Sequence, residues 1–442
     1  MSTKYYTYCS KCGKKIELER FGQDIKICDQ CKEKEYDRKM DWKQYSDCFG
    51  NKVRVSRTTG EFQVKTVIWG WDKTYKGNME RYYINGDYYV GGVRGSWHHG
   101  KGKMTYADGI VYEGDWNNGV YWGKGKITWP SGSWYEGDWV DGSRTGKGRY
   151  TWADGSYYEG DFVKGNFHGN GERAYSDGCK YVGQFKDDLR HGKGIMQWPS
   201  GDVYEGEFNQ DLRHGKGTYT WANGNSYQGD WVENHRIGKG KFTWADGCYY
   251  KGDFVDGYFN GYGERTYSDG CKYKGQCKDD LRHGKGIMQW PSGDVYEGEF
   301  KQDLRHGKGT YTWSNGNSYE GDWVENHRTG KGRYTWANGD WYEGDWVDNV
   351  KDGKGRLTWA NGCYYEGDFV KDCFQGVGRR FYIDNVTYYG EFYKNKRHGK
   401  GVRIATDGTS IEYYYENNKI VCETKDATKE IVDRIYGAMK KD

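Results

Sequence analysis

The sequence repeats itself every 23 residues, and this period constrains the fold more than any other feature. The string Tyr-Glu-Gly-Asp-Trp that begins at Tyr112 returns at Tyr135, and an anchor tyrosine recurs fourteen times without insertion or deletion. Such self-similarity is typical of arrays in which each unit packs only on its neighbours. The anchors are Tyr89, Tyr112, Tyr135, Tyr158, Tyr181, Tyr204, Tyr227, Tyr250, Tyr273, Tyr296, Tyr319, Tyr342, Tyr365 and Tyr388.

Each repeat is predicted to form a β-hairpin. Residues 135–140 and 148–152 are two short runs rich in aromatic residues that favour strands. Asp154-Gly155 follows them, and this dipeptide suits a tight turn with positive φ. Because helical periodicity is absent from the repeats, the array is predicted to be all-β.

Alternation along each strand predicts two different faces. Tyr135 and Trp139 share one face with glycines, while Glu136 and Asp138 point to the other. The second strand adds basic residues such as Lys147 to the charged face, where cross-strand ion pairs are expected. Glycines on the first face leave room for aromatic rings to lie over the backbone, which explains how a single sheet could hold together.

Charge and hydropathy exclude several classes of function. The chain has 67 Lys and Arg against 64 Asp and Glu, so it lacks the positive excess of a nucleic-acid-binding protein. No apolar run reaches the roughly 18 residues that span a bilayer. Residues 1–10 contain no apolar signal segment, so secretion is not expected.

These observations predict an elongated, single-layer antiparallel ribbon of about 14 tandem hairpins. Four N-terminal cysteines and an apolar stripe near the C-terminus add a small N-terminal zinc-binding module and a short C-terminal helix to the expected fold. The first repeat is degenerate, because it keeps the glycine register but lacks the anchor tyrosine. The expected divisions are 1–40 for the zinc module, 41–65 for a linker or N-terminal cap, 66–410 for the array (66–88 degenerate, full repeats from 89), and 411–442 for a C-terminal cap.

The repeat resembles the MORN repeat (membrane occupation and recognition nexus). The shared signature is Tyr-x-Gly-Asp/Glu-Trp/Phe, followed by Gly-Lys-Gly and Asn/Asp-Gly, over residues 66–410. The resemblance implies a ribbon of hairpins and a scaffolding role in cytoskeletal or membrane-associated assemblies. The pattern lapses at Val93 and Cys277, which replace Trp or Phe, and at Tyr262 and Val377, which replace Lys.

Four N-terminal cysteines form a candidate metal site. Two Cys-x-x-Cys pairs separated by fifteen residues are typical of a tetrahedral structural zinc site, similar to a zinc ribbon. One structural Zn²⁺ per chain is therefore expected, while disulfides and free thiols are the alternatives. A closed four-thiolate site leaves no position for a substrate. The predicted ligands are Cys9, Cys12, Cys28 and Cys31.

The remaining cysteines are expected to be unreactive and unpaired. Cys179, Cys248, Cys271 and Cys363 share one column of the repeat. Even adjacent members lie two strand spacings apart, near 10 Å, beyond the roughly 7 Å that a disulfide spans. A reducing compartment, the cytoplasm, is expected.

No catalytic residue is predicted. Seven histidines precede the same glycine of the repeat and are interpreted as hairpin-turn residues: His99, His168, His191, His214, His283, His306 and His398. The recurring carboxylates are interpreted as a solvated ladder. The Gly-Lys-Gly strings lack the spacing of a phosphate-binding loop.

Residues 425–441 are the one predicted helix. Ile431, Ile435 and Met439 stand four residues apart and form an apolar stripe. The helix is interpreted as a cap over the last hairpin, with a partner-binding or dimerising helix as the alternative.

The sequence therefore favours a non-enzymatic scaffold that binds protein partners or a second copy through an aromatic groove and a charged face. A peripheral module with weak affinity for membrane phospholipids is the second hypothesis, and an enzyme or enzyme-regulatory subunit is a remote third. The protein is expected in the cytoplasm, peripheral to membranes or the cytoskeleton. Predicted partner-binding residues are Tyr135, Trp139, Trp152, Tyr204, Trp221, Trp244, Trp290, Trp313, Trp336 and Trp359.

Overall fold

The structure, a computed structural model, describes the backbone of four strands within residues 1–57, and the ranges 76–83 and 85–424. The chain divides into unit 1, residues 1–222, and unit 2, residues 223–442. The predicted zinc ligands Cys9, Cys12, Cys28 and Cys31 lie outside the described residues, as does the predicted helix over 425–441.

Unit 1 contains β1 to β17. Its strands are β1 (Tyr5–Tyr8), β2 (Lys15–Leu18), β3 (Asp41–Ser46), β4 (Lys52–Arg57), β5 (Lys76–Tyr82), β6 (Tyr88–Arg94), β7 (Trp97–Thr105), β8 (Val111–Asn117), β9 (Val120–Thr128), β10 (Trp134–Val140), β11 (Ser143–Thr151), β12 (Tyr157–Val163), β13 (Asn166–Ala174), β14 (Lys180–Lys186), β15 (Leu189–Gln197), β16 (Val203–Asn209) and β17 (Leu212–Thr220). β1 pairs with β2, and β3 pairs with β4.

Unit 2 contains β18 to β35. Its strands are β18 (Ser226–Val232), β19 (His235–Thr243), β20 (Tyr249–Val255), β21 (Tyr258–Thr266), β22 (Lys272–Lys278), β23 (Leu281–Gln289), β24 (Val295–Lys301), β25 (Leu304–Thr312), β26 (Ser318–Val324), β27 (His327–Thr335), β28 (Trp341–Val347), β29 (Val350–Thr358), β30 (Tyr364–Val370), β31 (Cys373–Phe381), β32 (Thr387–Tyr393), β33 (Lys396–Ile404), β34 (Ser410–Glu416) and β35 (Lys419–Thr424). Across the described residues of both units, no helix has the length and apolar character to cross a membrane.

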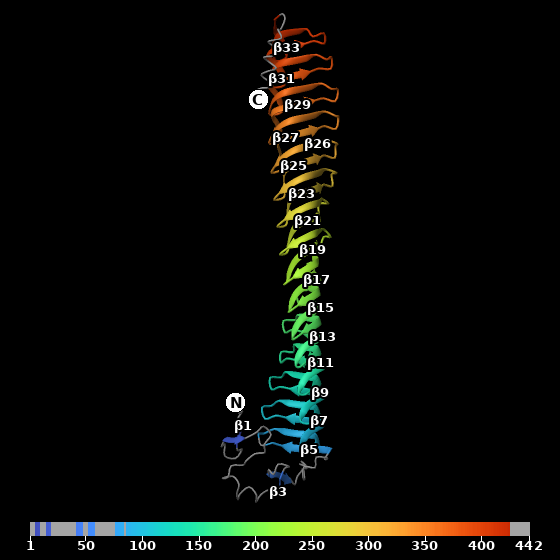
Figure 1. Ribbon diagram of the computed structural model, residues 1–442, viewed down its shortest axis with the longest axis vertical. Coiled ribbons are helices and arrows are strands. Elements are labelled where there is room, and N and C mark those ends of the chain that lie inside the picture. The colour runs from blue at the N-terminus through green and yellow to red at the C-terminus, as the bar shows by residue number, and fades with distance from the viewer. Residues whose placement is uncertain are drawn as a thin grey trace. The chain divides into compact units, whose positions relative to one another are not determined.

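Within each unit the array is a single antiparallel sheet in which neighbouring strands of the chain lie side by side (Figure 1). In unit 1, β10 pairs with β9 on one side and with β11 on the other. In unit 2, β27 pairs in the same way with β26 and β28. The predicted single-layer antiparallel sheet of hairpins is confirmed for the described repeats.

Each repeat contains two turns, of which the sequence analysis found one. Asp154-Gly155 lies in the predicted loop, where Gly155 N donates to the carbonyl of Trp152. The second turn is Asp141-Gly142, with φ of 46° and 73°, and it joins β10 to β11 in the manner of a type I′ hairpin. β11 therefore begins at Ser143 rather than at residue 148.

The prediction that the seven histidines are turn residues was wrong. His168, for example, lies within β13 and opposes Asp161 of β12. The error has the same cause, because the turn ends before the histidine column, with two residues between them, instead of containing it.

The core consists of aromatic rings that cover the glycines of one sheet face. Tyr135 is fully buried, and its hydroxyl donates to the backbone carbonyl of Asp138 at 2.9 Å. A Cβ at Gly148 would lie 2.5 Å from Cε2 of Tyr135, so the ring occupies the space that a side chain would need. Tyr135 also meets Trp139 and Phe162 in edge-to-face contacts at 5.1 and 4.9 Å.

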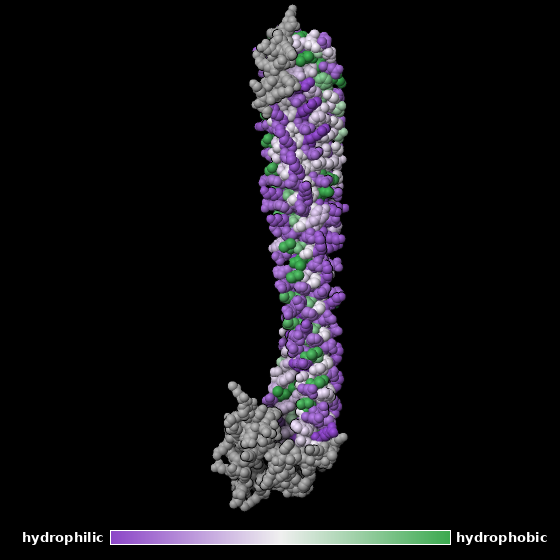
Figure 2. Space-filling model, viewed as in Figure 1, coloured by the Kyte–Doolittle hydropathy of each residue, from purple (hydrophilic) through white to green (hydrophobic). Residues whose placement is uncertain are grey.

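The opposite face carries the predicted ladder of charges. Lys124 Nζ lies 2.6 Å from Asp138, and Lys126 Nζ lies 3.2 Å from Glu136. Asp138 also accepts a hydrogen bond from the backbone N of Lys147 at 2.9 Å, next to the bulge in the β10–β11 pair. Figure 2 shows mostly hydrophilic residues on the visible surface, with hydrophobic residues scattered among them.

We expect Gly332→Ala to destabilise unit 2 by about 1–3 kcal/mol, the usual cost of overpacking. A Cβ at this position would lie 2.5 Å from Cζ of Tyr319, whose ring is fully buried. Urea unfolding midpoints measure the effect. Lys331→Ala is the control, because it removes only an exposed ion pair with Asp345. An equal loss of stability in both variants would contradict the ring-over-glycine account.

Candidate functional site: the aromatic face

The sheet face that carries the anchor tyrosines also presents a row of half-exposed tryptophans, here named the aromatic face. Each ring lies directly after the second strand of its hairpin, as Trp152 follows β11. The loop holds it there, because Trp152 N donates to the carbonyl of Ser156. The row comprises Trp129, Trp152, Trp198 and Trp221 in unit 1, and Trp244, Trp290, Trp313, Trp336 and Trp359 in unit 2.

In unit 2 tyrosines connect these tryptophans into a continuous row of rings. Trp290 lies 5.4 Å from Tyr311, which lies 4.6 Å from Trp313. The row continues from Trp313 to Tyr334 at 5.3 Å and on to Trp336 at 4.7 Å. Three successive repeats therefore present one aromatic surface.

The structure divides the predicted partner-binding residues into two groups. Tyr135 and Tyr204 are 0% exposed and Trp139 is 5% exposed, so these three form the floor of the face and offer no contact area. The other seven are half-exposed and lie on the same face of their units: Trp152, Trp221, Trp244, Trp290, Trp313, Trp336 and Trp359. Partner binding by this second group stays a prediction.

A second column of side chains on this face, nine residues after each anchor, was not among the predicted site residues. It holds a planar or cationic side chain, and we call it the planar column. Phe167 stacks on Tyr158 at 3.9 Å, whereas Arg144 places its guanidinium 5.7 Å from the ring centre of Tyr135. The 23-residue period could have revealed this column, because its residue type recurs at a fixed distance from each anchor. The column reads His98, Tyr121, Arg144, Phe167, Arg190, Arg213, Arg236, Phe259, Arg282, Arg305, Arg328, Lys351, Phe374 and Arg397.

The cations of the planar column differ in what balances their charge. Arg282 forms an ion pair with Asp303 at 2.9 Å. In the next repeat, Arg305 Nε donates instead to the side-chain oxygen of Asn326 at 3.3 Å. Burial lowers the pKa of the Arg305 guanidinium, because the charged form is poorly solvated there.

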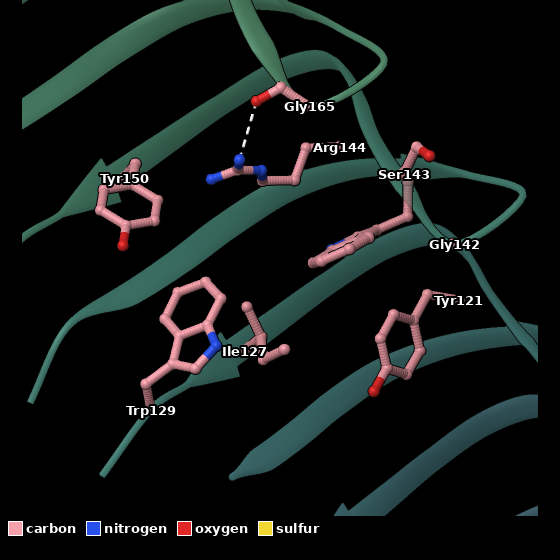
Figure 3. A pocket seen from close by; sticks show the side chains of 9 residues that line it. Tyr121, Ile127, Trp129, Gly142, Ser143, Arg144, Tyr150 and Gly165 are labelled. Carbon is pink, nitrogen blue, oxygen red and sulfur yellow. Dashed lines mark hydrogen bonds between the residues drawn. The ribbon is translucent and has the colours of Figure 1, made fainter. Parts of the chain in front are cut away.

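The aromatic face is hollowed beside Arg144 in unit 1 (Figure 3). The hollow has a volume of about 430 Å³, and Trp129, Tyr150 and Ser143 are among its lining residues. Arg144 Nη2 donates to the carbonyl of Gly165 at 2.8 Å, drawn as the dashed line. An aromatic hollow with a guanidinium in its wall suits an acidic or planar group of a ligand.

Acid–base chemistry is not favoured by the groups on this face. Burial raises the pKa of Tyr311 to about 12, so its hydroxyl stays protonated near neutral pH. That hydroxyl donates to Asp294 at 3.0 Å. Within the ranges that the structure describes, no group of three His, Cys, Asp or Glu residues is placed to hold a metal ion.

The cysteine column lies where other repeats connect one loop to the next. Asp202 Oδ1 accepts a hydrogen bond from Ala222 N at 2.8 Å, and Asn225 does the same for Ala245. A thiol is a weak acceptor, so a cysteine at this position serves the connection poorly. Every described cysteine is a free thiol, but Cys422 is exposed, so the expectation that these cysteines are unreactive does not hold for it.

We expect Cys277 to resist alkylation in the folded protein while Cys422 reacts. Burial raises the pKa of Cys277 to about 11, so little thiolate exists at about pH 8, whereas Cys422 is exposed. Peptide mass spectrometry after iodoacetamide treatment measures both, and urea should make both reactive. Equal labelling in the folded state would contradict the placement of Cys277 in the core.

Comparison with sequence families finds the MORN repeat in thirteen copies, which cover more than half of the chain. The copies match residues 89–111, 112–134, 135–157, 158–180, 181–203, 204–226, 227–249, 250–272, 273–295, 296–318, 319–341, 342–364 and 388–410. The interval 365–387 is not matched, although β30 and β31 form the same hairpin there. A search of curated proteins finds no matching relative.

Solved structures match with low similarity. A mutant TCP10 domain of Danio rerio CPAP is 11% identical and covers 57% of this chain and 98% of its own, with a TM-score of 0.21. The SAS-4 TCP domain of Drosophila melanogaster, in complex with a proline rich motif of Ana2, is 13% identical over 45% of this chain and 90% of its own, with a TM-score of 0.17. Streptogramin B lyase is 14% identical over 59% and 88%, with a TM-score of 0.12. Similarity this low supports no argument about function.

Proposed function

The chain belongs to the MORN repeat family, and on that premise we propose that it is a non-enzymatic scaffold that binds protein partners on its aromatic face. MORN repeats in general indicate a repeat scaffold or a membrane-binding role, and the family is generally non-enzymatic.

The observation that supports the proposal is the row of half-exposed tryptophans, which occur in nine of the fourteen repeats. Trp, Tyr and Arg dominate the binding energy of protein interfaces, and all three gather on this face. Trp313, for example, is held between Tyr311 and Tyr334 at 4.6 and 5.3 Å. Rings held in this way lose little freedom when a partner binds, which favours affinity.

The charged face gives the membrane hypothesis less support. Lys308 Nζ lies 2.6 Å from Asp322, and Lys239 Nζ lies 2.6 Å from Asp253. Attraction to anionic lipids requires clustered basic residues without local counter-charges. A ladder of paired charges produces only a weak field, so we favour protein partners.

We expect the triple variant Trp290→Ala, Trp313→Ala, Trp336→Ala to lose most of its partner capture. Affinity purification from the native host with quantitative mass spectrometry identifies the captured proteins and measures the loss. The control is Trp134→Ala with Trp341→Ala, because these rings lie against Lys126 and Arg333 of the charged face. Unchanged capture by a folded triple variant would reject the aromatic face. Flotation with anionic liposomes in place of protein capture would favour the membrane role.

We also propose that Cys9, Cys12, Cys28 and Cys31 hold one structural Zn²⁺. The support is the spacing of the two thiolate pairs, and a segment of about 35 residues is too short to fold on a core of its own. Free thiols elsewhere in the chain support residence in the reducing cytoplasm. Elemental analysis of the purified protein should find one zinc per chain, lost in Cys28→Ser. Zinc content unchanged by Cys28→Ser would contradict the assignment.

A further inference from the structure

Two neighbouring guanidinium groups on the aromatic face of unit 2, those of Arg305 and Arg328, face an asparagine where Arg282 and Lys351 face an aspartate. Arg305 Nε and Nη2 donate to the side-chain and backbone oxygens of Asn326, both at 3.3 Å. Arg328 donates in the same way to Asn349, at 3.4 and 2.8 Å. Within the described ranges, neither arginine has a carboxylate at ion-pair distance.

The repeats on either side show the balanced arrangement. Arg282, before them, pairs with Asp303 at 2.9 Å, and Lys351, after them, pairs with Asp372 at 3.5 Å. The partner always comes from the second residue of a hairpin turn, whose φ is 68° at Asp303 and 66° at Asp372.

The turn backbone does not change when asparagine replaces aspartate. The φ angle is 73° at Asn326 and 70° at Asn349, close to the values at the two aspartates. Both asparagines also accept the backbone N–H of their arginine at 2.9 Å, as Asp303 does. The substitution therefore removes two negative charges and leaves the geometry unchanged.

The environment of these cations makes their missing counter-charge costly. The Arg305 guanidinium lies 4.7 Å from the ring of Trp323, and that of Arg328 lies 4.6 Å from the ring of Trp346. Burial lowers the pKa of both groups. Arg282 and Arg328 add repulsion at Arg305, whereas Asp372 acts at Arg328 in the opposite direction without outweighing burial. An unbalanced cation in poorly solvated surroundings gains more from a bound anion than an exposed one does.

The spacing of the two cations selects the shape of the ligand. β25 and β27 are separated by β26, so equivalent side chains stand two strand spacings apart, about 9.6 Å. A polyproline II segment advances about 9.3 Å in the three residues of one turn. Trp313 and Trp336 recur at the same interval. Residues three apart in such a segment would therefore meet equivalent groups of successive repeats.

We propose that this part of the aromatic face binds an acidic protein segment in polyproline II conformation, with one carboxylate on Arg305 and another, three residues away, on Arg328. The inference rests on the proposed scaffold function and specifies the chemistry of its partner. Guanidinium groups bind carboxylates through short, charge-assisted hydrogen bonds. The flat rings of Trp313 and Trp336 suit the apolar side chains of a polyproline II segment.

The test uses the full chain and a fluorescent peptide built from Pro-Pro-Glu triplets, with binding measured by anisotropy. The double variant Asn326→Asp, Asn349→Asp should bind the peptide at least about tenfold more weakly, because each new carboxylate competes with the peptide for its arginine. Tenfold is the effect of losing one charge-assisted hydrogen bond. This variant keeps both arginines and every ring. It gives each arginine a carboxylate in the position that Asp303 occupies beside Arg282. Its unfolding midpoint should not fall.

Two further variants make the test specific. Asp303→Asn removes the counter-charge of Arg282 and should tighten binding of a longer run of triplets by about tenfold. Lys308→Gln should change nothing, because Lys308 lies on the charged face, where it pairs with Asp322.

The outcomes separate this inference from the function on which it rests. A control peptide has the same composition but places its glutamates next to one another. If it binds as tightly as the Pro-Pro-Glu peptide, the spacing of the two arginines does not select the ligand. If the protein binds anionic vesicles but not the peptide, and the Asn326→Asp, Asn349→Asp variant loses the vesicle binding, the site belongs to a lipid headgroup and the proposal is rejected. If the Asn326→Asp, Asn349→Asp variant still captures the native partner while the triple tryptophan variant does not, the scaffold function stands. The inference that the partner is an acidic segment is then rejected.

Discussion

The rest of the structure depends on the contact between each anchor tyrosine and the glycines beneath it. A Cβ at Gly137 would lie 2.5 Å from Cα of Gly148, and one at Gly148 would lie 2.5 Å from the Tyr135 ring. Neither glycine can be replaced without moving the ring or the strand. Because Tyr135 also packs edge to face on Trp139 and Phe162, the rings form a core that needs only adjacent repeats.

This constraint leaves the planar column free to vary in charge. Its geometry requires a flat or elongated group over the anchor ring, and both Phe167 and Arg144 meet that requirement. Stacking therefore preserves the fold while the column changes from neutral to cationic. The choice of aspartate or asparagine in the next turn, as at Asp303 and Asn326, then decides whether a cation is balanced. Recognition can change in this way without disturbing the tyrosine–glycine contact.

Charged groups consequently have different surroundings on the two faces of the sheet. On the charged face, pairs such as Lys124 with Asp138 satisfy each other in contact with water, and each contributes little to stability. They account for a near-neutral chain with a net charge of +3. On the aromatic face, the cations of the planar column are partly buried and surrounded by rings, so each has a larger effect on what binds. Arg305 and Arg328 illustrate this, since their surroundings and not their number give them importance.

The sequence by itself determined the hairpins, the two faces and the ion-pair ladder, because a 23-residue period and strict alternation admit few other arrangements. It also indicated the glycines that make room for rings. Only the tertiary structure decided that Tyr204 is fully buried while Trp221 is half-exposed, since burial depends on the rings of adjacent repeats. Likewise, pairing of β28 with β29 showed that Asp348-Asn349 is a two-residue turn with positive φ at both residues. The counter-charge of Arg328 comes from a turn 21 residues later, and only folding brings the two together.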